Sequence, residues 1–443
     1  MARATVLEVG QFIDEQPYSR FQFLTAAMCS ALVFTDGFDT QSMGFVAPAL
    51  AAQLHITRAA LGPILSSGLF GMMIGALVFG PMADRFGRKP IIVISVFLFG
   101  VLSLLTATAT TAQEILIYRF LTGLGLGGAM PNAIALTGEY TPKRSRATGI
   151  MTMFVGFTLG GASGGFVAAG LISRFGWQSV FIVGGLCPCI VALVAMVFMP
   201  ESIRFLVLKG GQERRVARYI SRIAPKAGIS PGMSFEVAEE RSPGFVVKQL
   251  FTEGRGGVTL LLWVMFFMNL LDLYFLIGWL PTVMSDAGVA VQAAILIASL
   301  FQLGGVTGNL VLGRVIDRTM SFRVLGVLYL FSALCIFFIG AAGGSVPLLV
   351  VSVFATGLAC LGGQSSSNAL TSTYYPTAIR STGLGWALGM GRIGSIVGPI
   401  LGGLLLTITP ETRRVFWAAA IPPLIATAAA FFAASIIKKQ ARN

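Results

Sequence analysis

The sequence predicts an all-α polytopic membrane protein, with twelve transmembrane helices arranged in two pseudo-symmetric halves of six helices each. Composition, span length and an internal repeat predict this fold. Hydrophobic residues make up 55% of the 443 residues and charged residues 11%, a balance typical of membrane proteins rather than of soluble ones. A transmembrane helix needs roughly 20 apolar residues. About twelve stretches reach this length: 21–51, 59–82, 90–108, 114–138, 147–172, 179–199, 257–284, 290–315, 324–342, 346–374, 378–406 and 415–437.

The second half of the chain repeats the first. The only long polar interruption, residues 200–255, leaves six spans on either side. At an offset of about 233 residues Pro48 aligns with Pro281, and one further residue of offset aligns Tyr140 with Tyr374. A parallel repeat of two six-span halves is a transporter architecture, with the binding site between the halves near the midplane. We expect five parts: a cytoplasmic N-terminal segment (1–20), a first half (21–199), a cytoplasmic central loop (200–256), a second half (257–437) and a cytoplasmic tail (438–443).

Basic residues predict the orientation of the chain. Lysine and arginine (31 residues) outnumber aspartate and glutamate (18 residues), and the basic clusters fall in every second loop. The positive-inside rule therefore places both termini in the cytoplasm, and we expect the protein in the cytoplasmic (inner) membrane. A basic surface for anionic lipid or RNA is the alternative, but the spread of charge over alternate loops disfavours a nucleic-acid partner. The lone His55 and the Cys187-Pro188-Cys189 pattern, which lacks C-x-x-C spacing, predict neither a metal nor a cofactor.

Two aspartates, Asp36 and Asp39, interrupt the first span near its middle. An ionised carboxylate at bilayer depth costs at least ~2.5 kcal/mol on insertion scales, so such residues are typical of functional sites. At a spacing of three they share one helix face, and we expect them to look into one site. Two carboxylates in one cavity repel each other, so at least one is expected to bind a proton near physiological pH. The proton belongs to the pair, and the spacing does not assign it to one member.

Three more charges, Arg119, Asp272 and Arg392, lie within the spans. At ~1.5 Å per residue, Asp272 and Arg392 lie roughly 20 Å from the nearest loop, and Arg119 roughly 10 Å from the outer side. A guanidinium keeps its proton and offers a planar fork that matches a carboxylate. Arg392 is therefore predicted to bind the carboxylate of the substrate. Arg119 has two candidate roles, substrate contact or counter-charge to the aspartate pair. Asp272 aligns with Asp39, so a static ion pair is the alternative to a substrate contact.

The loop after the second span, GPMADRFGRK at residues 80–89, is a glycine-containing turn with one acid among three bases. It can pair with loops of its own half and with the positive N-terminal end of the eleventh helix. Such a contact would hold the cytoplasmic side shut in one state and release it in another. A solvated loop that only sets topology is the alternative. Glu139, at the inner end of the fourth span, is assigned to a salt bridge with a loop.

These motifs resemble those of the major facilitator superfamily over essentially the whole chain. GPMADRFGRK looks like its signature loop and is echoed, without the trailing GRK, at GRVIDR (313–318). RFLTGLG (119–125) resembles its fourth-helix motif, and PESIRFL (200–206) the element after its sixth helix. DGFD (36–39) with GMGRIG (389–394) is most similar to the aromatic acid:proton symporters, which take up benzoate-like carboxylates, including hydroxybenzoates. The resemblance implies a gating set: Asp84, Arg85, Gly87, Arg88, Arg146, Glu201, Asp317, Arg318 and Arg380.

Polar and aromatic side chains near the midplane complete the expected site. Gln364 and Asn368 in the tenth span are candidates to hydrogen-bond a ring hydroxyl, and Tyr274 in the seventh to stack on an aromatic ring. Packing and hydrogen bonding between helices is the alternative for each of them. The glycine-rich run at residues 156–165 predicts a close approach of helices where the halves move against each other.

The sequence therefore predicts a proton-coupled secondary transporter that imports an aromatic carboxylate by alternating access, and not an enzyme. Its expected proton-coupling residues are Asp36, Asp39 and Arg119. Its expected substrate-binding residues are Arg392, Asp272, Gln364, Asn368 and Tyr274. The alternatives are an exporter or a carrier for another organic anion, such as a sugar acid or a dicarboxylate. We expect a monomer.

Overall fold

Twelve membrane-spanning segments are found in the residues that the computed structural model describes, which are 6–227, 233–237, 247–319, 321–342, 345–376, 379–409 and 411–440. This confirms the predicted fold class. The first half contains α2 (Arg20–Gln53), α3 (Arg58–Phe86), α4 (Arg88–Thr106), α5 (Ala112–Tyr140), α6 (Arg146–Phe175) and α7 (Gln178–Phe198). The second half contains α10 (Gly256–Asp286), α11 (Val291–Thr319), α12 (Phe322–Ala341), α13 (Val346–Tyr374), α14 (Arg380–Ile408), and a last span divided into α15 (Thr412–Ala419) and α16 (Ile421–Gln440).

Local sequence signals fix where several helices begin. The Ser19 hydroxyl accepts a hydrogen bond from the backbone N–H of Gln22, and the Gln22 side chain accepts one from the backbone N–H of Ser19. This reciprocal pair is a capping box and marks the start of α2. Thr111 and Glu114 form the same box at the start of α5. Between α3 and α4 the chain turns through Gly87 alone, whose φ of 104° is in the region that favours glycine. The two-helix hairpin around the predicted gating loop is therefore specified by the sequence.

The sequence repeat is a repeat of packing. In the first half α2 packs on α6 and α3 on α5; in the second, α10 packs on α14 and α11 on α13. Glycines allow these contacts, because a Cβ at Gly160 would lie 2.0 Å from the carbonyl oxygen of Phe34 on α2. A Cβ at Gly165 would likewise lie 1.6 Å from the hydroxyl oxygen of Ser299 on α11 of the second half, so the predicted close helix approach at residues 156–165 is found both within the first half and between the halves.

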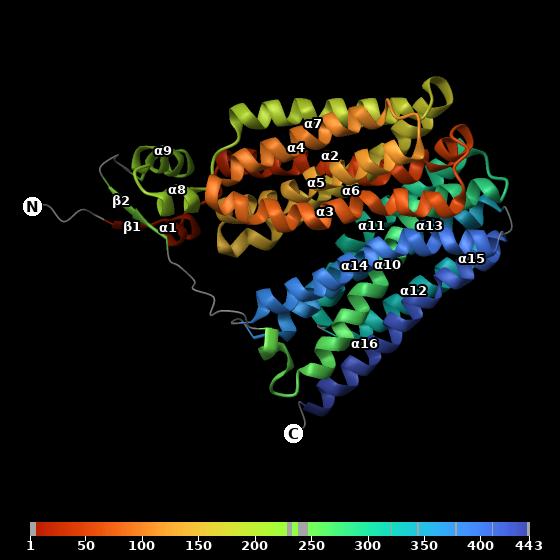
Figure 1. Cartoon of the computed structure of the whole chain (residues 1–443). Coiled ribbons are helices and arrows are strands. Elements are labelled where there is room, and N and C mark those ends of the chain that lie inside the picture. Colours follow the sequence, from red (N-terminus) through yellow and green to blue (C-terminus); the bar gives the residue numbers. More distant parts are fainter. Residues whose placement is uncertain are drawn as a thin grey trace, which may run out of the picture.

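A small cap covers one end of the first half. The N-terminal strand β1 (Val6–Glu8) pairs in parallel with β2 (Ser234–Glu236) of the central loop. These strands join α1 (Val9–Glu15), α8 (Ile203–Lys209) and α9 (Glu213–Ile223), as Figure 1 shows on the left. Single 3₁₀ turns, η1 (Lys143–Ser145) and η2 (Val247–Phe251), precede α6 and α10. We call this end of the molecule the capped end and the opposite one the far end.

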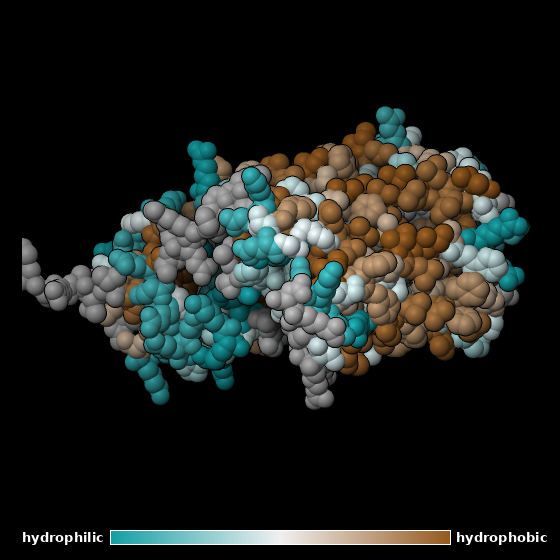
Figure 2. Space-filling view, turned by 90° about the horizontal axis from the view of Figure 1, so that it is seen from below, coloured by the Kyte–Doolittle hydropathy of each residue, from teal (hydrophilic) through white to brown (hydrophobic). Residues whose placement is uncertain are grey.

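The two halves meet toward the far end and diverge toward the capped end (Figure 1). Between the halves α3 packs on α14, α6 on α11 and α2 on α10. At the far end, the guanidinium of Arg58 on α3 lies 2.6 Å from the carboxylate of Asp286 on α10. Apolar side chains cover the middle of the face seen in Figure 2, and hydrophilic ones gather at its two ends. That belt is the surface a bilayer requires.

Candidate functional site

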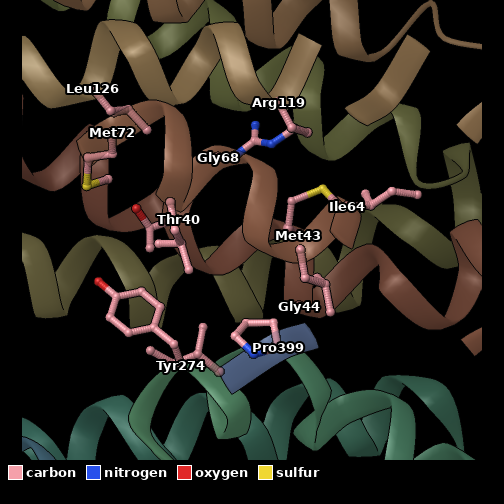
Figure 3. A pocket seen from close by; sticks show the side chains of 14 residues that line it. Thr40, Met43, Gly44, Ile64, Gly68, Met72, Arg119, Leu126, Tyr274 and Pro399 are labelled. Atoms are coloured by element: carbon pink, nitrogen blue, oxygen red, sulfur yellow. The ribbon is translucent and has the colours of Figure 1, made fainter. Parts of the chain in front are cut away.

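A pocket lies between the two halves of the molecule. Its walls come from α2, α3 and α5 of the first half and from α10 and α14 of the second. Figure 3 shows Thr40, Met72 and Arg119 on one side and Tyr274 and Pro399 on the other. The pocket has a volume of about 30 Å³, enough for about two water molecules. The binding of a larger solute therefore requires its walls to move.

Asp39 is held in a buried ion pair inside the first half. Arg119 of α5 donates to both carboxylate oxygens, with Nη1–Oδ1 at 2.9 Å and Nη2–Oδ2 at 2.6 Å. The hydroxyl of Ser103 on α4 donates to Oδ1 at 3.2 Å, and the guanidinium carbon of Arg119 lies 5.4 Å from the centroid of the Phe181 ring. The Asp39 side chain is 0% exposed and that of Arg119 4%. The geometry gives Arg119 the counter-charge position, one of its two expected roles.

Asp36 has a different environment from Asp39. It is 1% exposed, and its Oδ1 accepts from the hydroxyl of Thr40 at 3.1 Å, while its Oδ2 is buried without a hydrogen-bond partner in the described parts of the chain. It interacts electrostatically with Arg392 of the other half. The sequence placed both aspartates in one site. A spacing of three residues leaves them about 60° apart around the helix axis, so each faces different neighbours.

Arg392 on α14 faces the first half. Its Nη1 donates to the thioether sulfur of Met72 on α3 at 3.3 Å, and the Tyr274 hydroxyl is close enough to interact with both Arg392 and Asp36. No carboxylate of a described residue forms an ion pair with it. A thioether is a weak acceptor, so this guanidinium keeps its capacity for a strong planar partner. Arg392, Tyr274 and Asp36 thus form one polar group across the interface.

Asp272 and the polar residues of α13 lie within the second half. Asp272 is 1% exposed, and Cys360 on α13 donates its thiol to Oδ2 at 3.4 Å. Asp272, like Asp36 and Arg392, is not among the residues that line the pocket of Figure 3. Gln364 accepts from the side chain of Asn269 on α10 at 2.8 Å and donates to Asn368 at 3.4 Å. The expected grouping of Asp272 with Arg392 is therefore not formed in this conformation, and Gln364 has partners within its own half.

Part of the predicted gating set forms one cluster at the capped end. The Glu201 carboxylate accepts from the backbone N–H groups of Arg88 and Lys89, at 2.8 and 3.1 Å, at the first turn of α4. A Cβ at Gly87 would lie 2.5 Å from the same carboxylate. Arg88 pairs with Glu139, which also accepts from the hydroxyl of Ser202 at 2.6 Å. The expected salt bridge between Glu139 and a loop is confirmed, and the loop contacts its own half.

The remaining gating candidates are exposed or undescribed. Asp84, Arg85, Arg146 and Arg380 are exposed. Asp84 forms no ion pair with another residue that the structure describes, so its expected contact with the start of the eleventh span is not made in this conformation. The side chains of Asp317 and Arg318 lie outside the described residues, and their predicted role stays untested. In the described ranges no three His, Cys, Asp or Glu residues are grouped to hold a metal ion.

The sequence did not point to several contacts of this interface. These include the far-end ion pair of Arg58 with Asp286, the sulfur of Met72 next to Arg392, and the hydroxyl of Ser103 on Asp39. A further bond joins the hydroxyl of Ser66 on α3 to the carbonyl of Ile396 on α14 at 2.7 Å. The one available signal for the ion pair was Arg58 itself, a rare basic residue outside the basic loops.

The chain is similar to known proteins over almost its whole length. The profile of the Major Facilitator Superfamily matches residues 29–255 and 262–442. The chain is 42% identical, over 95% of its length and 94% of the relative's, to the 4-hydroxybenzoate transporter PcaK of Pseudomonas putida. It is 39% identical to the gallate transporter of Pseudomonas putida, over 96% and 94% of the two chains.

Among solved structures, a bacterial homologue of the human lysosomal transporter Spinster, inward-facing and unoccupied, superposes with a TM-score of 0.73 at 15% identity. The superposition covers 95% of this chain and 98% of that one. At this identity the likeness shows the fold. The chain belongs to the major facilitator superfamily and, within it, to the aromatic acid transporters.

Proposed function

We propose that this member of the major facilitator superfamily imports a benzoate- or hydroxybenzoate-like carboxylate together with protons, by alternating access. One observation carries the substrate class: Arg392 presents its guanidinium across the interface, and no carboxylate of the described chain pairs with it. The names of its relatives, transporters of 4-hydroxybenzoate and of gallate, support the same class. The substrate carboxylate takes the bidentate position on Arg392, in place of the weak thioether contact with Met72.

Tyr274 of the second half and Thr40 of the first line the pocket between the halves (Figure 3), and Tyr274 also interacts with Arg392. The phenol of Tyr274 provides an apolar ring for the substrate and a hydroxyl near its carboxylate. Binding therefore joins groups of both halves, which is the condition for a substrate to promote closure around itself. Asn368 and Gln364, further along α13, are the proposed contacts for ring hydroxyls.

Asp36 is the proposed proton-coupling carboxyl. It is buried, its Oδ2 has no hydrogen-bond partner among the described residues, and it lies near Arg392. An ionised Asp36 competes with the substrate carboxylate for Arg392, whereas a protonated Asp36 does not. Protonation therefore favours anion binding at this site. Asp39 acts through its ion pair with Arg119, which keeps that charge compensated while α2 moves.

The direction of opening follows from the charges and the contacts. The capped end carries the basic loops and is the proposed cytoplasmic side, with both termini, of the inner membrane. The halves diverge there and are joined at the far end by Arg58 and Asp286 (Figure 1), so this conformation faces the cytoplasm. In the opposite state Asp84 of the loop pairs with Arg380 at the start of α14, and the far-end ion pair opens.

Uptake by purified protein in liposomes tests this function. Radiolabelled benzoate, 4-hydroxybenzoate, glucuronate and succinate are added outside, with the exterior acidic and the interior alkaline. Weak aromatic acids also cross bilayers as neutral molecules, so vesicles without protein and vesicles with Arg392→Ala are the controls. We expect uptake of the two aromatic acids above both controls, and its loss when a protonophore removes the gradient. Protein-dependent uptake of only the sugar acid or the dicarboxylate would assign another organic anion, and uptake that ignores the gradient would rule out proton symport.

A further inference from the structure

The two halves place an aspartate at the same repeat position, Asp39 on α2 and Asp272 on α10, with different surroundings. Both side chains are buried, at 0% and 1% exposure. The guanidinium of Arg119 on α5 neutralises Asp39 through two hydrogen bonds. At the offset of 234 that relates α5 to α13, the position of Arg119 is occupied by Val353, which is fully buried. The second half therefore repeats the buried carboxyl of Asp39 as Asp272, but it has no cation at the position that corresponds to Arg119.

The contacts of Asp272 do not supply that cation from elsewhere. Its Oδ2 accepts a thiol hydrogen bond from Cys360 at 3.4 Å, and the hydroxyl of Ser332 on α12 lies 3.1 Å from the same sulfur. Its Oδ1 is buried and has no hydrogen-bond partner among the residues that the structure describes. A thiol is a weak donor. The Oδ1 oxygen of Asp272 therefore has neither a hydrogen bond nor a counter-charge from the described residues.

Two charged groups on helices packed against α10, Arg392 and Asp36, face other partners. Arg392 of α14 interacts with Asp36 and Tyr274, and Asp36 of α2 interacts with Thr40, Asp39 and Arg392. Cys360 is the only titratable side chain of the described chain that interacts with Asp272, and Cys335 of α12 interacts with Cys360 in turn. An ionised carboxylate so enclosed would be both desolvated and unpaired, the costliest state for a charge in a protein.

We propose that Asp272 is a second proton-binding site of the transport cycle, located in the second half and occupied by a proton in this conformation. The inference rests on the proposed proton-coupled function. When the halves move, the Asp272 carboxyl gains access to water, so that its proton exchanges once per cycle. Asp36 is the proton site at the interface, and Asp272 is separated from it by the body of α10.

Two proton sites predict how transport responds to voltage. A monoanion that enters with one proton carries no net charge, whereas one that enters with two protons carries one positive charge inward. A membrane potential of about 100 mV, inside negative, would then accumulate the acid roughly fiftyfold at equilibrium, because one elementary charge gains about 2.3 kcal/mol. Passive permeation of the neutral acid does not respond to voltage, so accumulation driven by the membrane potential reports transport by the protein.

The test uses proteoliposomes with equal pH on both sides, a potassium gradient and valinomycin, with radiolabelled 4-hydroxybenzoate as the probe. We expect the wild type to accumulate the acid under an inside-negative potential. Asp272→Asn, a neutral side chain of the same shape, is expected to retain uptake driven by a pH gradient and to lose the response to voltage. Asp272→Glu, which restores a titratable group, is expected to recover it.

The outcomes separate this inference from the proposed function. A wild type that takes up the acid with a pH gradient but ignores voltage overturns the second site alone. The same holds if Asp272→Asn keeps the wild-type voltage response, or if it loses binding of the acid, which would make Asp272 a substrate contact. A wild type without gradient-driven uptake overturns the proposed function instead.

Infrared spectroscopy provides a test that does not depend on the folding of Asp272→Asn. A protonated Asp272 has a carboxylic acid C=O stretch, and Cys360→Ala removes its hydrogen bond and shifts that band. Cys29→Ala, a buried cysteine of the first half, is the matched control and leaves the band in place. A spectrum in which Cys360→Ala shifts no acid band overturns the proposal.

Discussion

The first and second halves share one helix packing but hold their buried charges in different ways. In the first half the buried acids have partners: Asp39 binds Arg119, and Glu139 and Glu201 bind Arg88 and the start of α4. In the second half Asp272 accepts only a thiol hydrogen bond, and Arg392 contacts a thioether and the Tyr274 hydroxyl without forming an ion pair with a described carboxylate. The first half therefore holds its buried charges in fixed pairs. The buried charges of the second half find their partners in the substrate, in a bound proton or in groups that the movement of the halves brings near. Asp36 is the exception, a group of the first half that faces the second.

The largest expected effect is on folding stability, and it compares Asp39 of the first half with Asp272 of the second. Asp39→Asn leaves Arg119 buried without its anion, which costs about 3–5 kcal/mol by analogy with other broken buried pairs. Asp272→Asn replaces a neutral acid by an amide of the same shape and should change stability by less than about 1 kcal/mol. Thermal unfolding of both variants in detergent measures the difference. Equal losses would show that Asp272 is a charged structural group like Asp39, and the double variant Asp39→Leu with Arg119→Met should recover part of the loss.

A second prediction concerns the availability of Arg392. Arg392→Lys keeps the charge but loses the planar fork, and should weaken the binding of an aromatic acid roughly tenfold to a hundredfold, as expected for a lost charge-assisted hydrogen bond of about 1.5–3 kcal/mol. Titration calorimetry with 4-hydroxybenzoate measures this affinity. Arg218→Lys, on the exposed face of α9, is the control. An unchanged affinity in Arg392→Lys would remove this residue from the binding site.

A third prediction tests how closely the halves approach. A Cβ at Gly44 on α2 would lie 2.0 Å from the backbone oxygen of Ile277 on α10, which cannot turn away as a side chain can. Gly44→Ala should therefore disfavour the far-end-closed conformation by about 1–3 kcal/mol. Gly170→Ala is the matched control, because nothing lies within 4 Å of its added Cβ. Spin labels at two exposed residues, Lys209 in the cap on the first half and Lys439 at the end of α16, report the change in their separation. Equal distance distributions in both variants would contradict this prediction.

The smallest expected effect is at the far end. Arg58 and Asp286 are about one-third exposed, and ion pairs of this kind contribute about 0.2–1 kcal/mol. Arg58→Ala should shift the same pair of spin labels toward the opposite conformation by less than a factor of about five. The exchange of both residues, Arg58→Asp with Asp286→Arg, should restore the wild-type distribution. If the exchange behaves as the single variant does, the pair has no role in closure.

Several features of the site were open to prediction because they follow from position along one helix. The depth of Asp36 and Arg392 within their spans follows from the count of residues, and the pairing of Glu139 with a loop from its place at a helix end. The close approach at residues 156–165 follows from glycine composition. Asp36 and Asp39 interact electrostatically, as their shared helix face predicts. A difference of about 60° around the axis gives them different further neighbours, and no count along one helix names those neighbours.

Other contacts join residues too far apart in the chain for any local pattern. Ser66 and Ile396 are 330 positions apart, and Arg58 and Asp286 are 228 apart. The parallel pairing of β1 with β2 joins the N-terminal segment to the central loop, two parts that the sequence treated as separate. Each depends on how the halves and the cap are placed in three dimensions.

The sequence by itself determined the membrane class, the twelve spans, the twofold repeat and the presence of charges at bilayer depth. Apolar length, periodicity and internal similarity are properties of the chain alone, so no partner helix is needed to see them. Only the tertiary structure decided which charges are compensated. It placed Arg119 on Asp39, left Asp272 with a thiol, and set Arg392 across the interface from Asp36. The physical reason is that the state of a buried charge depends on its nearest polar atoms, and those come from helices that only packing brings together.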